Sequence, residues 1–292
     1  MKRLLVLSLI TLLSLPLAIY AADEKAPTPR KHTWELGTEI SHITYREPHL
    51  MKETGVMYGV VGSYTYRGWL PPSPEEMDKA MLKIEGKGSW GKVDYSSPIS
   101  GTMENIPNWL LEFRGLLGYD FAVNTFTLTP YLGVGYRYLN DDSSGKVTSL
   151  DDLGYERESN YIYIPIGTEV TTPFNNWLVG ATLEYDIFCW GKQKSHLSDA
   201  RLWDPIWGYY TFPDIENRQK KGYGIRGSIK FQKKGERLNF VIEPYIRYWN
   251  IKRSKVVTTS TISENGLWII TGSFVEPKNN STEAGCRLAV NF

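Results

Sequence analysis

The chain has 292 residues, and its formal net charge at pH 7 is only +1. Such a balance argues against a nucleic acid or a strongly anionic molecule as the partner. Aromatic residues make up 13 % of the chain, with 19 Tyr and 10 Trp against 10 Phe, and Gly is plentiful at 26. After the N-terminus no second long apolar run follows, which excludes a bundle of membrane-spanning helices.

The N-terminal segment has the layout of a secretory signal peptide. Lys2 and Arg3 precede an apolar run over residues 4–18, and charged residues begin at Asp23. The run is shorter than the roughly 20 residues that a membrane-spanning helix needs. We therefore expect residues 1–21 to be a signal peptide, residues 22–31 a short lead, and residues 32–292 one exported domain.

Segments of alternating polarity follow one another along that domain. Runs of about ten residues that alternate with period 2 are typical of a membrane β-barrel, whose strands contact lipid on one face and the lumen on the other. Helical patterning is nearly absent. The predicted strands are residues 33–45, 56–67, 81–90, 109–121, 127–139, 160–170, 177–190, 223–231, 240–249 and 284–292.

A soluble β-sandwich also alternates, but three features favour a barrel. The strands are longer than the usual five or six residues, and ionisable residues recur at mid-strand on the less apolar face. Short joins also alternate with long ones, as expected for an outer-membrane barrel. The short joins are residues 122–125, 171–176 and 232–237, the longest are 190–222 and 252–281, and the join at 68–80 is an exception. We predict a ten-stranded antiparallel up-and-down transmembrane β-barrel, all-β, with short periplasmic turns and long outer loops.

The last predicted strand carries a resemblance to a known family. AGCRLAVNF, residues 284–292, alternates apolar with other residues and ends on Phe292. It resembles the C-terminal signature of Gram-negative outer-membrane proteins, and LTPYLGVGYRYL and NYIYIPIGTEV resemble paired central strands of the outer-membrane β-barrel superfamily. EPKNNSTEAGCRLAVNF resembles the closing strand of an uncharacterised branch of it. The resemblance implies location in the bacterial outer membrane, contact with its lipid and lipopolysaccharide, and recognition of the C-terminal strand by the assembly machinery. It implies no activity, because one barrel fold serves unrelated functions.

If the apolar faces contact lipid, the lumen receives equal numbers of acids and bases. Unpaired buried ions cost several kcal/mol each, and side chains can fill a barrel of about eight strands. We expect a charge-filled, closed lumen, with a narrow low-conductance pore as the alternative. The acids are Glu35, Glu39, Glu85, Glu112, Glu169, Glu184, Asp186 and Glu243, and the bases are Lys83, Lys87, Arg114, Arg137, Arg226, Lys230, Arg247 and Arg287.

A hydrolytic group at the outer rim is a further hypothesis. Nucleophilic and acid–base chemistry need a His within hydrogen-bond reach of an acid and a nucleophile. His196, Ser198 and Asp199 could form such a group in an omptin-like protease or a lipid-modifying enzyme. Their close spacing is unfavourable, because such groups normally assemble from separate elements. We expect an ordinary solvated loop and no enzyme.

The aromatic loop at residues 201–214 is the other surface candidate. Its side chains Trp203, Trp207, Tyr209 and Tyr210 either fold over the barrel mouth, which we favour, or bind an extracellular ligand. Asp141 and Asp142 could bind Ca²⁺, but a solvated turn is the simpler interpretation. The His residues are scattered, and the two cysteines do not have the close spacing of a metal-binding pair. We therefore expect no metal site and no cofactor.

Two further expectations complete the prediction. Cys189 and Cys286 fall on strands that we place well apart, so both should be free thiols. The expected function is structural, adhesive or ligand-binding, through the long outer loops.

Overall fold

The computed structural model describes residues 30–68 and 80–292. The predicted signal peptide therefore lies outside the described residues. So do most of the predicted lead and of the join at 68–80.

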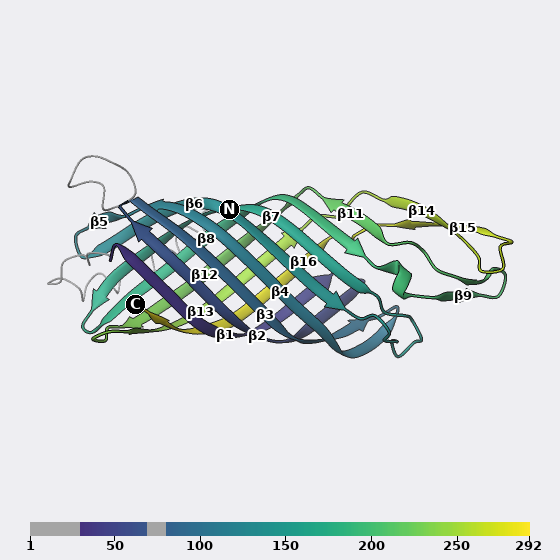
Figure 1. The fold of residues 1–292 in the computed structure, drawn as a ribbon, viewed down its shortest axis with the longest axis horizontal. Helices are drawn as coiled ribbons and strands as arrows, with labels where there is room; N and C mark the ends of the chain where they lie inside the picture. Colours follow the sequence, from purple (N-terminus) through teal and green to yellow (C-terminus); the bar gives the residue numbers. More distant parts are fainter. Residues whose placement is uncertain (1–29, 69–79) are drawn as a thin grey trace.

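Ten long antiparallel strands form a closed barrel, inclined to its long axis (Figure 1). The last strand pairs with the first and closes the sheet. In sheet order the strands are β1 (His32–Glu47), β2 (Met51–Arg67), β3 (Ala80–Ser97), β4 (Gly101–Tyr119), β6 (Phe126–Asp142), β7 (Glu156–Phe174), β8 (Trp177–Ser195), β12 (Gly222–Lys233), β13 (Asn239–Ile251) and β16 (Asn279–Asn291). Every predicted segment forms one of these strands, so the predicted all-β, ten-stranded antiparallel barrel is confirmed.

Most strands are longer than predicted, because an apolar pattern detects only part of each. On β1 the outward residues Leu36 and Ile40 are apolar and exposed, whereas the inward Glu35 and Glu39 are buried. Beyond Ile40 the strand continues to Glu47 with polar outward residues, for example Arg46. Where the outward residues become polar, the sequence no longer alternates between apolar and polar residues, although the strand's backbone hydrogen bonds to its neighbours continue.

Shorter strands lie outside the ten. They are β5 (Phe121–Val123) beside β6, β11 (Ile215–Gln219) beside β8, the hairpin of β9 (Leu202–Asp204) and β10 (Gly208–Tyr210), and the hairpin of β14 (Val257–Ile262) and β15 (Ile269–Phe274). The segments with β9, β14 and β15 extend beyond one end of the barrel (Figure 1). We call this end the outer end. Within the described residues, no helix is both long and apolar enough to cross a membrane.

The connections at the two ends differ. At the opposite end, which we call the inner end, Asn124 and Asn175 have positive φ angles of 51° and 52° in tight turns, a conformation that Asn adopts more readily than most residues. At the outer end, residues 143–155, 196–221 and 252–278 are long connections. Residues 48–50 and 98–100 at the same end are tight turns, so not every outer join is long.

The interior contains small apolar clusters at different levels of the lumen. Tyr163 and Trp249 pack edge to face with ring centroids 5.0 Å apart, and both are almost fully buried. Ile43 and Met57 belong to a second cluster nearer the outer end. Cys189 and Cys286, on β8 and β16, are free thiols, as predicted.

Gly135 on β6 gives the Tyr163 ring its space. A Cβ added to Gly135 would lie 2.1 Å from Cζ of Tyr163, whereas a Cβ on Gly115 of the neighbouring strand β4 would meet nothing within 4 Å. We expect Gly135→Ala to lower the free energy of unfolding by about 1–3 kcal/mol, the usual cost of overpacking. Gly115→Ala should leave it unchanged or slightly raise it.

Urea unfolding of the refolded barrel in detergent micelles, followed by Trp fluorescence, measures both variants. Equal stabilities for Gly135→Ala and Gly115→Ala would contradict this packing of Tyr163.

Candidate functional site

Charged side chains meet in the middle of the lumen around Arg226 of β12. Its Nη2 lies 2.5 Å from Oε1 of Glu112. Its Nε lies 2.8 Å from Oδ2 of Asp186 and 3.0 Å from Oε1 of Glu184. Glu184 and Asp186 both point inward because they are two residues apart on β8, and the register places Arg226 opposite Glu184. Arg226 is 6 % exposed, so these are buried ion pairs.

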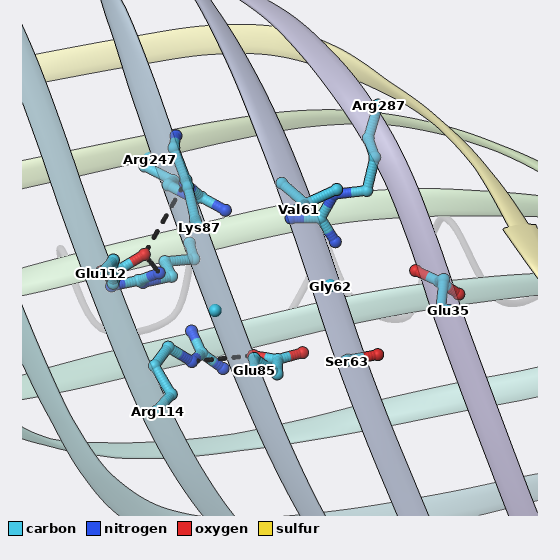
Figure 2. Close-up of a pocket in the computed structure, with 12 residues that line it drawn as sticks. Glu35, Val61, Gly62, Ser63, Glu85, Lys87, Glu112, Arg114, Arg247 and Arg287 are labelled. Atoms are coloured by element: carbon cyan, nitrogen blue, oxygen red, sulfur yellow. Dashed lines mark hydrogen bonds and ion pairs between the residues drawn. The ribbon is translucent and has the colours of Figure 1, made fainter.

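Arg114 of β4 forms a second contact across the barrel. Its Nη1 and Nη2 each lie 2.8 Å from an oxygen of Glu184, a bidentate arrangement. Its Nε lies 2.9 Å from Glu85, an ion pair visible in Figure 2. Because β6 and β7 separate β4 from β8 in the sheet, the contact with Glu184 spans the lumen.

The remaining lumen charges continue the network toward β1, β13 and β16. Lys87 contacts Glu39 at 2.5 Å and also pairs with Glu283. Arg247 lies 3.8 Å from Glu112, an ion pair that a dashed line marks in Figure 2. Further ion pairs join Arg287 to Glu243 at 3.1 Å and Lys230 to Glu35 at 2.5 Å. We call this set the charge layer: Glu35, Glu39, Glu85, Lys87, Glu112, Arg114, Glu184, Asp186, Arg226, Lys230, Glu243, Arg247, Glu283 and Arg287.

Two aromatic hydroxyls complete the centre of the charge layer. The Tyr163 hydroxyl donates to Oε1 of Glu112 at 2.8 Å and accepts from Nη2 of Arg226 at 2.8 Å. Tyr131 donates to Glu184 at 2.8 Å. Arg137, another predicted lumen base, is also buried, but its guanidinium lies over the Trp249 ring, 5.8 Å from the centroid.

Little space remains within the charge layer. Two cavities between its described residues have volumes of about 30 Å³ and about 80 Å³. Lys83 and Glu169, the other predicted lumen charges, line the larger one. Since one water needs roughly 10–15 Å³ of such volume, these cavities have room for a few waters and not for a solute channel.

A larger cavity of about 410 Å³ opens toward the outer end. We call it the outer cavity. Arg157 of β7 is the only base among the lining residues that the structure describes, and its Nη2 lies 2.6 Å from Glu47 and 3.2 Å from Glu276. Burial raises the pKa of the Glu276 carboxyl, although Arg157 opposes that shift. The lining acids are Glu47, Glu53, Asp141, Asp152 and Glu276.

Glu53 and Asp141 are two buried acids of the outer cavity. They are 7 % and 6 % exposed, and their carboxyl groups lie near each other. Asn108 donates to Asp141 at 3.4 Å. Within residues 30–68 and 80–292, neither acid forms an ion pair with a Lys or Arg.

The residues of the hydrolytic hypothesis are close together but do not form a triad. The Ser198 hydroxyl donates to Oδ1 of Asp214 at 2.6 Å, and Nδ1 of His196 lies 3.0 Å from the other oxygen of that carboxylate. Asp199 accepts from the backbone N–H of Glu156 at 3.0 Å. Ser198 and His196 thus share one acid, and no hydrogen bond joins the hydroxyl to the imidazole in the described chain.

The aromatic loop is only partly buried. Phe212 is buried against Phe274, with ring centroids 5.1 Å apart, and Trp207 and Tyr210 are half-buried. Trp203 and Tyr209 are 62 % and 46 % exposed on the β9–β10 hairpin, which extends away from the barrel (Figure 1). The expectation that these two rings fold over the mouth is therefore wrong.

Sequence reasoning missed Glu283 and most of the outer cavity. Glu283 follows the inward period of Arg287 on β16, so extending the predicted strand by one residue would have found it. Glu47, Glu53 and Arg157 lie where the strands continue past their apolar segments. Glu276 lies in the connection between β15 and β16, and no pattern in the surrounding sequence indicates that it lines the outer cavity.

No protein-family model matches the chain, and no curated protein matches it significantly. Among solved structures, the outer-membrane protease OmpT of Escherichia coli aligns over 93 % of this chain and 100 % of its own, with a TM-score of 0.53 and 11 % identity. The translocator domain of the autotransporter NalP of Neisseria meningitidis aligns over 98 % and 96 % with a TM-score of 0.43 and 9 % identity. The toluene transporter TodX of Pseudomonas putida aligns over 93 % and 95 % with a TM-score of 0.34 and 8 % identity. At 11 % identity the likeness to OmpT concerns the fold alone, and the predicted resemblance is confirmed at that level: the chain has the β-barrel fold of an outer-membrane protein.

Proposed function

We propose that the chain is a bacterial outer-membrane β-barrel that does not conduct solutes and binds a cationic ligand in its outer cavity. The observation that supports it best is the division of charge along the lumen. Every acid of the charge layer forms an ion pair with a base, and the layer is tightly filled, whereas the described lining residues of the outer cavity include five acids and one base.

The outward face of the barrel supports location in a membrane. Apolar side chains are exposed around the wall on every strand, which is unfavourable in water and expected against lipid. Aromatic residues lie at both limits of this band, with Trp34 and Phe231 toward the inner end and Trp109 toward the outer end. Such positions match the aromatic girdles of outer-membrane barrels.

The charge layer supports a closed lumen instead of a narrow pore. Arg226 and Glu112 extend from opposite sides of the barrel and meet with Asp186 and Glu184 in the middle. A pore selective for one sign of ion needs an excess of charge, and here acids and bases pair directly. Leaving one partner of a buried pair alone is strongly destabilising, so the network resists local opening.

The outer cavity supports a small cationic ligand. Its volume of about 410 Å³ is within the usual range for small-molecule sites, roughly 300–1,000 Å³. Glu53 and Asp141 are buried near each other, and within the described residues neither forms an ion pair with a Lys or Arg. An ammonium or guanidinium group could form charge-assisted hydrogen bonds with both carboxylates.

Conductance in planar lipid bilayers tests the closed lumen. We expect no current steps from the wild-type barrel. The double variant Glu112→Ala with Arg226→Ala keeps the net charge but also leaves Asp186 without its base, so heat-dependent gel mobility must first show that it folds. The folded variant should have an open water path and give reproducible steps.

The control for conductance is Arg201→Ala with Glu264→Ala, which removes an exposed ion pair of the outer connections. It should remain silent. Steps from the wild-type protein of the size seen for the lumen variant would show that the charge layer does not close the barrel.

Titration calorimetry with spermidine, on the barrel in neutral detergent, tests the outer cavity. We expect saturable binding that weakens about tenfold or more in Glu53→Gln and in Asp141→Asn, because a hydrogen bond to a charged group contributes about 1.5–3 kcal/mol. Asp142→Asn is the matched control, since Asp142 is adjacent in sequence but is not part of the cavity lining.

Equal losses in Asp141→Asn and Asp142→Asn would indicate general attraction to a negative surface. The absence of saturable binding to the wild-type protein would contradict a cation site in the outer cavity.

A further inference from the structure

We propose that Glu156, Glu158 and His196 form a binding site for a divalent transition-metal ion such as Zn²⁺ at the outer end of the barrel. One oxygen from each carboxylate and a ring nitrogen of the histidine lie within 4.8 Å of one another. The three side chains lie apart from the outer cavity, so this site is independent of the function proposed above.

The β7–β8 ladder brings the three residues together. Glu156 and Glu158 are two residues apart on β7 and point to the same face, whereas Arg157 between them points into the outer cavity. β8 ends at Ser195, but the backbone N–H of His196 donates to the carbonyl of Glu156 at 2.9 Å and continues the ladder by one residue. The imidazole therefore lies beside both carboxylates.

The distances suit a tetrahedral ion. Nε2 of His196 lies 2.9 Å from Oε1 of Glu158 and 3.9 Å from Oε2 of Glu156. Zn–N and Zn–O bonds of 2.0–2.2 Å at tetrahedral angles separate neighbouring ligand atoms by about 3.4 Å, between the two observed values. Small side-chain rotations would bring the three atoms to bonding distance of one ion.

The surrounding residues orient the histidine for binding through Nε2. Nδ1 of His196 lies 3.0 Å from Oδ2 of Asp214, so its proton has an acceptor and Nε2 can carry the lone pair. A carboxylate on the far nitrogen of a metal-bound histidine is the usual second contact in zinc sites.

The carboxylate of Glu156 is also held in place. Nδ2 of Asn140 donates to its Oε1 at 2.6 Å, which leaves Oε2 toward His196. The side chains of His196, Glu158 and Glu156 are 17 %, 27 % and 33 % exposed, so an ion can enter from solution. Three protein ligands leave a fourth position for water or another external oxygen.

The simpler interpretation is a protonated His196 paired with Glu158 and Asp214 and no metal. The two interpretations differ in the role of Nε2, because a metal replaces its proton. Direct measurement of metal binding separates them.

The experiment is calorimetric titration of the full-length, metal-free barrel in detergent with ZnCl₂. We expect one Zn²⁺ per chain. His196→Ala should weaken binding at least 100-fold, and Glu158→Gln should weaken it as well. Asp214→Asn leaves all three ligands in place and should weaken it about 10–100-fold, the usual effect of losing such a second contact.

The matched control is Glu216→Gln. Glu216 is an exposed acid of β11 that pairs with Lys192 at 2.9 Å, and it is not one of the three ligands. Its variant should bind Zn²⁺ with the affinity of the wild-type protein, and heat-dependent gel mobility shows whether each variant is folded. Absence of stoichiometric binding to the wild-type barrel would overturn the proposal, as would a folded His196→Ala variant with unchanged affinity.

Discussion

The pairing of buried charge is the constraint on which the rest of the barrel depends. Ten strands enclose an interior narrow enough for side chains to meet across it, and an unpaired ion there costs several kcal/mol. Arg226 satisfies three carboxylates at once. Tyr163 links the same centre to the apolar cluster with Trp249, and its ring needs the space at Gly135. The ion pairs and the packing are therefore coupled.

Because the charge layer fills the lumen, space for a ligand remains at the outer end. There β7 contributes side chains to two clusters of polar residues. Its alternating side chains reach both sides of the wall. Arg157 points inward between Glu47 and Glu276, whereas Glu156 and Glu158 point outward beside His196. One strand that continues past the apolar band thus contributes to two separate polar sites. Neither site would exist if the strands ended where their apolar faces end.

The sequence predicts the features that depend on the two-residue period of each strand. It does not predict contacts between residues that are far apart in the chain. Period 2 places Glu184 and Asp186 in the lumen because a strand determines the direction of each side chain. It cannot show that Arg114 reaches Glu184, because that contact depends on how the whole sheet curves and closes. The acids of the outer cavity follow from strand extensions that have no apolar signal. The contacts of His196 depend on the register of β7 against β8 and on Asp214 from a connection.

The position of the unbalanced charge determines which ions the barrel attracts and how far into the lumen those ions can move. A lumen with charge of one sign along its length would draw ions inward and through. Here the acids exceed the bases in the outer cavity, while Arg226, Arg114 and Lys87 neutralise the acids beneath it. The field therefore favours cations at the mouth, and the paired layer below offers them neither an unpaired acid nor enough space. This arrangement is the basis on which we propose binding at the mouth instead of passage, since the same acids above an open lumen would be the entrance of a cation channel.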